Sequence, residues 1–133
     1  MSILGIGVDL VDVARIARLQ EKHGSHFLRR VFTENEIAAC AGRAERLAAR
    51  FAAKEAVAKA FGTGIGEAMA FAEIEVLNEP SGQPRIRLHG RAAATAAQRR
   101  AGGIMLSLSH THTHAIAQVI VLSRDSRAVP PGQ

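Results

Sequence analysis

Residues 50–66, RFAAKEAVAKAFGTGIG, constrain the fold most strongly, because they predict one long helix that ends in a glycine-rich turn. Alanine is the commonest residue here, and no proline or glycine occurs before Gly62, a composition that favours a helix with a glycine exit. At about 100° per residue, one face of the helix carries only small side chains, against which another element can pack closely. These side chains belong to Ala49, Ala52, Ala53, Ala56 and Ala60.

The charged residues of this helix do not form one solvated stripe opposite the alanines. Arg50 and Lys54 project in one direction, Glu55 and Lys59 project in another, and apolar residues flank both pairs. The simplest interpretation of Glu55 and Lys59 is an ordinary surface ion pair at i,i+4 spacing, which contributes about 0.2–0.5 kcal/mol. The alternative is a functional cluster, and the rest of the chain decides between the two.

The first part of the chain predicts a strand and a helix. Residues 3–11, ILGIGVDLV, predict a buried strand with one carboxylate, Asp9. A buried carboxylate needs a cation or a hydrogen-bond donor beside it, although Asp9 is also suitable as the N-cap of the next helix. That amphipathic helix is predicted over residues 13–23, with Val13, Ile16 and Ala17 facing the core.

A second helix start follows at Thr33. Thr33 and Glu36 have the spacing of a capping box, which predicts a helix to about residue 41. Gly42 then separates this helix from the long one, which is expected to begin near Ala44. Capping accounts for Glu36, whereas Glu34 has no such role and stays available for chemistry.

The second half of the chain predicts strands and one helix. Residues 71–77 and 85–88 form a hairpin around the turn 80–84, and residues 90–101 form an alanine-rich helix that Gly102 and Gly103 end. Two more strands follow at 104–109 and 115–122. The pattern predicts an α/β chain of the α+β type, with one domain over residues 1–122 and a loose tail over 123–133.

Charge and composition limit the kind of partner. Seventeen Lys and Arg residues against twelve Asp and Glu give a net charge of +5, which favours nucleic acid, an acidic protein or a phosphorylated small molecule. The chain has no Trp or Tyr, so a base-stacking surface is poorly supported. The single cysteine, Cys40, cannot form an internal disulfide and is expected in the core, which favours a reducing cytoplasm. No signal peptide or membrane span is apparent in the sequence.

Three alternating histidines, His110, His112 and His114, would share one face of an extended segment. Imidazoles so placed can hold a transition metal, but a solvated loop or one working histidine is the simpler interpretation. Three hypotheses therefore remain: an enzyme, a basic nucleic-acid-binding module, and a histidine-based metal-binding protein.

Four segments together resemble the holo-acyl-carrier-protein synthase family, the single-domain 4′-phosphopantetheinyl transferases. They are GIGVDLVDVARI, FTENEI, RFAAKEAVAKAFGTGIG and SLSHTHTHAIAQVI, and the resemblance covers residues 3–122. It implies a small, mostly antiparallel sheet packed on the long helix, and a cytoplasmic homotrimer with active sites between subunits. The implied reaction moves the phosphopantetheine arm of coenzyme A to a serine of apo-acyl carrier protein, in fatty acid biosynthesis. Magnesium is the implied cofactor, and adenosine 3′,5′-bisphosphate is the second product.

The resemblance also implies roles for individual residues. Asp9 and Glu55 match the magnesium ligands of the family, and carboxylates suit this hard cation. Lys59 matches the lysine at the scissile diphosphate. Further positions match the coenzyme site: Arg50, Lys54, Gly62, Thr63, Gly64 and His110, the last of these across a subunit boundary. Arg15 and Arg30 match the region that docks the acidic carrier protein.

The implied mechanism is in-line attack by the carrier serine on the β-phosphorus, with the protein positioning the reactants and neutralising charge. The base that accepts the serine proton stays open at this point. It is Glu55 directly, or a water held by the magnesium ion or by Glu34. Glu36 is the weaker candidate because capping already explains it.

Overall fold

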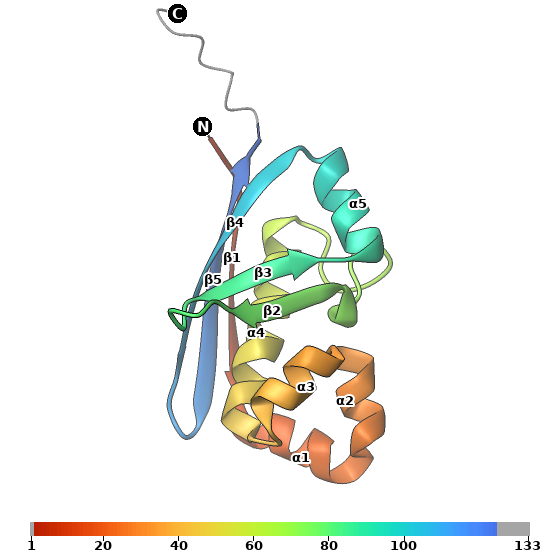
Figure 1. The fold of residues 1–133 in the computed structure, drawn as a ribbon, viewed down its shortest axis with the longest axis vertical. Helices are drawn as coiled ribbons and strands as arrows, with labels where there is room; N and C mark the ends of the chain where they lie inside the picture. Colours follow the sequence, from red (N-terminus) through yellow and green to blue (C-terminus); the bar gives the residue numbers. More distant parts are fainter. Residues whose placement is uncertain (1, 125–133) are drawn as a thin grey trace, which may run out of the picture.

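The computed structural model describes residues 2–124, so residues 125–133 of the predicted tail lie outside the described part. The elements are β1 (Ile3–Asp12), α1 (Val13–His23), α2 (Ser25–Val31), α3 (Glu34–Cys40), α4 (Ala44–Ala60), the 3₁₀ turn η1 (Phe71–Glu73), β2 (Ile74–Asn78), β3 (Pro84–Leu88), α5 (Gly90–Gln98), β4 (Ala101–His110) and β5 (His114–Ser123). In Figure 1, α4 runs behind the β2–β3 hairpin, alongside the longer strands, with α1, α2 and α3 gathered at one end. None of the helices in the described part is long and apolar enough to cross a membrane.

The strands form two antiparallel sheets. One has three strands in the order β1-β5-β4, and the other is the β2–β3 hairpin. Since β1 lies beside β5, the two ends of the described chain meet in one sheet. The predicted α+β class and its antiparallel sheet on a long helix are confirmed.

Strand β1 packs directly on α4 through glycine. A Cβ atom added at Gly5 would lie 1.9 Å from the carbonyl oxygen of Ala60, and one at Gly7 would lie 2.0 Å from that of Ala56. Both distances are far below van der Waals contact, so only glycine permits this approach. The predicted small-residue face of α4 is confirmed, because Ala52 and Ala56 on it are fully buried.

The prediction of a buried strand over residues 3–11 is only half right. The strand is present, but helix α4 covers one face of it, and the side chains of the other face point to solvent. Ile6 and Leu10 are each 63% exposed. Together with their neighbours across the sheet they form what we call the apolar sheet face: Ile6, Val8, Leu10, Met105 and Ile116.

Two of the three N-terminal helices follow the prediction, whereas α2 (Ser25–Val31) was not predicted. Helix α1 spans residues 13–23, and Val13 and Ile16 are buried, but Ala17 is exposed. Ala17 lies about 100° around the helix from Ile16, away from the stripe that meets the core. The capping box of α3 is confirmed, since the Thr33 side chain accepts from the Glu36 N–H and the Glu36 carboxylate accepts from the Thr33 N–H. Cys40 is buried as predicted.

Two predicted boundaries in the second half are wrong. Residues 71–73 form a 3₁₀ turn before β2, and α5 ends at Gln98 instead of residue 101. Residues 101–103 already belong to β4, where Ala101 pairs with Ser123 and Gly103 with Leu122 of β5. Pairing with β5 therefore extends β4 back to residue 101, through the two glycines that were expected only to end the helix.

Candidate active site

Two carboxylates meet where β1 crosses α4. Because side chains alternate along a strand, Asp9 points to the same side as Gly5 and Gly7, which is the side of α4. Gly5 meets Ala60 and Gly7 meets Ala56, so Asp9 continues towards the preceding turn of α4, where its charge acts on Glu55. Partial burial raises the pKa of Glu55, and the negative charge of Asp9 raises it further. The predicted pair of acidic residues is therefore brought together.

Two cations flank this acidic pair. The Lys59 ammonium lies 3.0 Å from Oδ1 of Asp9 and donates to the Val8 carbonyl at 3.1 Å. Arg15 of α1 places its guanidinium 5.4 Å from the centre of the Phe51 ring. The positive charges of Lys59 and Arg15 act to lower the pKa of Glu55, but burial and Asp9 outweigh them. The site thus gathers groups from β1, α1 and α4.

The donor set fits a magnesium ion. Asp9 and Glu55 offer hard oxygen atoms, and the mutual repulsion that raises the pKa of Glu55 is what a divalent cation would relieve. No group of three or more His, Cys, Asp or Glu side chains suited to a metal occurs within residues 2–124. Two protein carboxylates with open positions for phosphate and water are typical of magnesium sites, not of closed structural metal sites.

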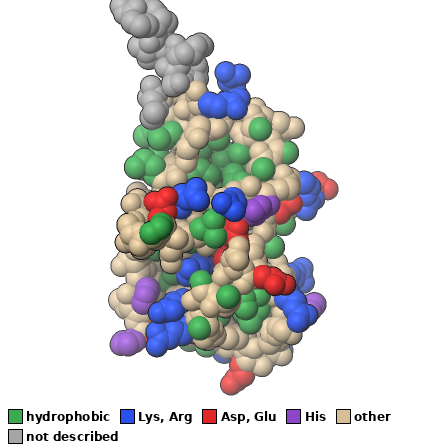
Figure 2. All heavy atoms as spheres, viewed as in Figure 1, with side chains coloured by type: hydrophobic (Ala, Val, Ile, Leu, Met, Phe, Trp, Pro, Cys, Tyr) green, Lys and Arg blue, Asp and Glu red, His purple; other side chains and the backbone are tan. Residues whose placement is uncertain are grey.

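A basic pocket of about 660 Å³ lies at the other half of α4. Its walls come from α3, α4, the β2–β3 turn and β4, through Ala39, Arg46, Ala49, Arg50, Asn78, Gly82, Gln83, Pro84, Leu106, Ser107, Leu108 and His110. Figure 2 shows Lys, Arg and His side chains gathered on this side of the molecule, below the hairpin. Arg50 is buried, and its Nε atom has no hydrogen-bond partner in the described part of the chain. A buried donor without a partner is suited to an anionic ligand.

The pocket contains two predicted coenzyme residues and one that the sequence analysis missed. Arg50 and His110, which are far apart in the chain, both line it. Arg46 also lines it and donates to the Ala39 carbonyl at 3.3 Å. The spacing of Arg46, Arg50 and Lys54, four residues apart each time, places all three on one helix face and would have indicated Arg46.

The structure does not support a coenzyme contact for Lys54. Its side chain is fully buried, and the ammonium lies 2.7 Å from Oε1 of Glu36. Burial lowers the pKa of Lys54, while the charge of Glu36 acts to raise it. Lys54 is therefore bound to other parts of the protein and faces away from solvent.

The turn after α4 offers no free backbone N–H groups for the coenzyme role that the resemblance implies for Gly62, Thr63 and Gly64. The Gly62 N–H donates to the Lys59 carbonyl at 2.9 Å, and the N–H groups of Thr63 and Gly64 both donate to the Ala58 carbonyl at 3.1 Å. These groups cap the C-terminus of α4 and are not free for a nucleotide.

Other predicted residues lie outside the acidic pair and the pocket. Glu34 is exposed at the start of α3, and no hydrogen bond or ion pair joins it to Asp9, Glu55 or Lys59 in the described structure. Arg30 is exposed on α2, beside a shallow concavity that it shares with Ser25, His26 and Arg29.

The three alternating histidines do not share one extended face. Strand β4 ends at His110 and β5 begins at His114, with a turn between them. His114 lies 3.0 Å from Asp12, whereas His112 lies 3.9 Å from Glu45. A metal centre on these histidines is therefore not supported.

Known proteins of this architecture share both sequence and fold with the chain. The 4′-phosphopantetheinyl transferase superfamily matches residues 5–119. The holo-[acyl-carrier-protein] synthase of Methylobacterium radiotolerans is 49% identical over 125 residues, 90% of this chain and 92% of the relative. That of Ruminiclostridium cellulolyticum is 46% identical over 125 residues, 91% of this chain and 93% of the relative.

Solved structures agree with the sequence relatives. The Helicobacter pylori holo-[acyl-carrier-protein] synthase in complex with coenzyme A is 33% identical, with a TM-score of 0.81 over 87% of this chain and 98% of that one. The Neisseria meningitidis holo-[acyl-carrier-protein] synthase is 34% identical, with a TM-score of 0.83 over 90% of this chain and 98% of that one. The acidic pair, the basic pocket and these similarities together show that the chain belongs to the holo-[acyl-carrier-protein] synthase family of the 4′-phosphopantetheinyl transferase superfamily.

Proposed function

We propose that the protein transfers the 4′-phosphopantetheine arm of coenzyme A to a serine of apo-acyl carrier protein and releases adenosine 3′,5′-bisphosphate. The observation that carries this proposal is the arrangement along α4, where a basic pocket and an acidic pair with a lysine lie on neighbouring turns of one helix. Arg50 and Glu55 are five residues apart, about 7.5 Å along the helix axis. Because five residues also turn the helix by about 140°, the pocket and the acidic pair lie on different faces of α4, which fits the proposed sharing of each active site between subunits.

Coenzyme A suits the pocket because its nucleotide end carries a 3′-phosphate besides the diphosphate. Arg46, Arg50 and His110 supply donors for such a group, and Arg50 has one donor still unused within residues 2–124. Charge-assisted hydrogen bonds from arginine to phosphate are among the strongest in proteins. The coenzyme complex of the Helicobacter pylori relative supports this assignment.

Asp9 and Glu55 would hold the magnesium ion, which when bound supplies positive charge beside the diphosphate. Lys59 is half exposed and can turn its ammonium from Asp9 towards a phosphate oxygen of the substrate. The serine oxygen forms a bond to the β-phosphorus while the bond from that phosphorus to the bridging oxygen breaks. The bridging oxygen leaves with adenosine 3′,5′-bisphosphate.

The serine proton goes to Glu55 in this proposal. Unlike Asp9, which pairs with Lys59, the partly exposed Glu55 forms no ion pair in the described part of the chain, so its carboxylate is open to accept a proton. Glu34 is not supported as the base, since none of its described contacts connects it to the acidic pair. Glu36 is excluded from the role, because its carboxylate is buried against Lys54.

The carrier protein would dock on the exposed basic surface of α1 and α2. Arg15 and Arg30 both belong to it, together with Arg18, Lys22 and Arg29. Arg15 also lies next to Glu55, so a carrier bound there would bring its serine towards the acidic pair. Positive charge on this surface suits an acidic partner and speeds its association.

We also propose a homotrimer that assembles through the apolar sheet face. Large exposed apolar patches are rare on monomers and mark interaction surfaces. The patch has side chains between 40% and 63% exposed, and it covers the side of the sheet that α4 leaves open. Active sites between subunits, a cytoplasmic location and a role in fatty acid biosynthesis follow the same family resemblance; the single buried cysteine supports the cytoplasm.

One assay tests the proposal against the basic nucleic-acid-binding module. The protein is incubated with coenzyme A, magnesium and an apo-acyl carrier protein, and mass spectrometry measures the carrier. We expect the mass to rise by one phosphopantetheine arm, and a carrier whose acceptor serine is replaced by alanine to stay unchanged. No mass gain, combined with salt-sensitive nucleic-acid binding that ignores magnesium, would favour the basic binding module instead.

A further inference from the structure

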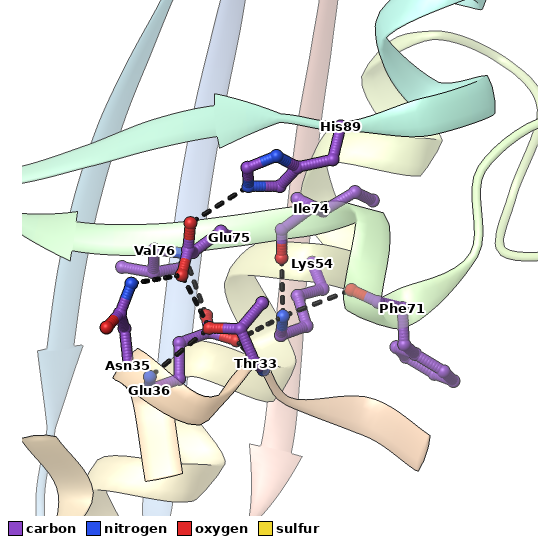
Figure 3. A network of polar contacts seen from close by, with 9 residues as sticks. All are labelled: Thr33, Asn35, Glu36, Lys54, Phe71, Ile74, Glu75, Val76 and His89. Carbon is purple, nitrogen blue, oxygen red and sulfur yellow. Dashed lines mark hydrogen bonds and ion pairs between the residues drawn. The ribbon is translucent and has the colours of Figure 1, made fainter. Parts of the chain in front are cut away.

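A buried polar cluster lies beside the basic pocket and takes no part in the chemistry proposed above (Figure 3). Its centre is the ion pair of Lys54 and Glu36, both of which have fully buried side chains. The Lys54 ammonium also donates to the carbonyl oxygens of Phe71, at 3.1 Å, and of Ile74. An ion pair withdrawn so far from water is costly to bury and needs an explanation.

Glu36 connects three elements through its two oxygen atoms. Oε1 accepts from Lys54 of α4 and from the Thr33 N–H at the start of α3, and Oε2 accepts from the Val76 N–H of β2 at 2.7 Å. The pair therefore fixes α3, α4 and the hairpin to one another.

Glu75 extends the cluster to the protein surface, as Figure 3 shows. Its carboxylate is buried and accepts from Thr33 at 2.5 Å and from Asn35 at 3.2 Å. Nε2 of His89 lies 2.9 Å from the other carboxylate oxygen, and the His89 side chain is 44% exposed. His89 and Asn35 are thus the exposed ends of the labelled cluster, and a mild substitution at His89 can reach the interior from the surface.

Each element that the ion pair joins also forms a wall of the pocket. Ala39 follows Glu36 by one turn of α3, and Arg50 precedes Lys54 by one turn of α4. Asn78 follows Val76 by two residues and begins the turn that closes the pocket. Three of the four walls are therefore attached to one buried pair of charges, and only β4 is held by the larger sheet.

We propose that Lys54 and Glu36 are positioning residues for the coenzyme: they set the spacing between α3, α4 and the hairpin turn, and thereby the affinity of the pocket for its nucleotide. The inference rests on the proposed function for the identity of the ligand. It explains why a lysine four residues from Arg50 is buried while Arg46 and Arg50 face the pocket. A buried pair of charges that fixes geometry can be present without adding net stability.

The central test removes both charges together. Lys54→Met/Glu36→Gln keeps the approximate volume and leaves an acceptor for the Val76 N–H. We expect the KM for coenzyme A to rise about tenfold or more, as misplacement of binding groups predicts, while the KM for the carrier stays within about twofold. The dissociation constant for adenosine 3′,5′-bisphosphate, measured by calorimetry, should rise by a similar factor.

A milder series tests the same idea from the surface. His89→Ala removes the donor to Glu75 and should raise the KM for coenzyme A, whereas His89→Gln keeps an N–H donor and should restore most of the affinity. The matched control is Gln98→Ala, at an exposed position of α5 outside the cluster and the pocket, which should leave the KM for coenzyme A and the dissociation constant for adenosine 3′,5′-bisphosphate unchanged. Thermal unfolding of each variant, measured alongside, separates a change in coenzyme affinity from a loss of stability.

The results distinguish failure of the positioning proposal from failure of the proposed function. A folded double variant with wild-type affinity for coenzyme A and for adenosine 3′,5′-bisphosphate overturns the proposal. If the double variant does not fold, the His89 series decides, and equal constants for His89→Ala and the wild type overturn it. Failure of the wild type to modify any carrier would refute the proposed function alone, because binding of adenosine 3′,5′-bisphosphate is measured without catalysis.

Discussion

Glu55 is the residue on which the proposed chemistry depends most. Its side chain is only partly buried, and its pKa is raised by burial and by Asp9, so it belongs to the site more than to the core. Replacement by glutamine keeps its size and removes its charge. We expect Glu55→Gln to lower kcat by about a thousandfold, in line with the loss of a ligand and a proton acceptor together.

The control for this prediction is Glu67→Gln, at an exposed position beyond α4. It should transfer the arm at the wild-type rate, and both variants should show wild-type thermal unfolding by circular dichroism. Near-normal turnover of Glu55→Gln would remove Glu55 from the reacting centre.

Substitution of Lys54 alone is expected to lower stability, because it leaves the buried charge of Glu36 without its cationic partner. Lys54→Met leaves the Glu36 carboxylate buried without a cation, held only by the N–H groups of Thr33 and Val76. Breaking one side of a buried ion pair costs about 3–5 kcal/mol of unfolding free energy. Urea denaturation measures the loss, and Lys22→Met, on the exposed face of α1, should stay within about 0.5 kcal/mol of the wild type.

Glu75 predicts how stability depends on pH. Burial acts to raise its pKa, but hydrogen bonds from Thr33, His89 and Asn35 outweigh burial and hold the pKa below the ordinary value. Such a group adds stability above its unfolded pKa of about 4.3, and this stability disappears as the pH falls through the folded pKa. The stability gap between wild type and Glu75→Gln should therefore be largest near neutral pH and narrow below about pH 4, as urea titrations at several pH values would show. A gap that is constant with pH would contradict the assignment.

The roles of single residues could be predicted where their partners lie close to them in the sequence. The Thr33–Glu36 cap follows from spacing alone, and the resemblance placed Asp9 and Glu55 in one site, where the structure also brings them together. Lys54 was misassigned because the helical period shows that it shares a face with Arg50 but not which part of that face is covered. The partner that buries it, Glu36, lies 18 residues earlier and appeared already explained by capping.

At the scale of elements, the contact between β1 and α4 decides whether the site exists. Gly7 lies against the backbone of Ala56, and a methyl group there would meet the carbonyl oxygen at 2.0 Å. Gly7→Ala must push the strand away from the helix, which costs about 1–3 kcal/mol as overpacking and moves Asp9 from Glu55. We expect a lower unfolding free energy, together with a higher magnesium concentration for half-maximal activity.

The matched substitution for this prediction is Gly66→Ala, since nothing lies within 4 Å of a Cβ atom at that position. It should leave stability and magnesium dependence unchanged. A Gly7→Ala variant with wild-type magnesium dependence would show that Asp9 reaches its position without the close backbone contact.

The boundaries of helices were predicted well where a capping residue or a glycine beside the helix sets its end. Capping at Thr33 and glycine at position 42 set the ends of α3 and the start of α4 close to the prediction. The end of α5 was misplaced because β5 recruits residues 101–103 into β4, and such pairing is not encoded nearby. The one-sided burial of β1 was missed for the same reason, since alternating glycines and large apolar residues do not reveal which face a helix covers.

For the whole molecule, the apolar sheet face predicts assembly. Ile6→Lys places a charge at a side chain that is 63% exposed in the single chain. If subunits meet there, the charge would be buried without a partner, and the assembly should dissociate. Sedimentation equilibrium is expected to give a trimer mass for the wild type and a monomer mass for the variant, with activity lost in parallel.

A lysine introduced away from the apolar sheet face provides the control for Ile6→Lys. Ala94→Lys adds a lysine on the exposed side of α5 and should keep both the mass and the activity of the wild type. A wild-type chain that sediments as a monomer would contradict the proposed role of the sheet face.

Helix α4 carries Arg46 and Arg50 of the basic pocket as well as Glu55 and Lys59 of the acidic site. A substitution that moves this helix would therefore change both coenzyme binding and turnover. The turn from Asn78 to Pro84 borders the same cavity without holding a reacting group. Redesign of this enzyme towards altered coenzymes would therefore begin in that loop, where substrate choice is separable from turnover.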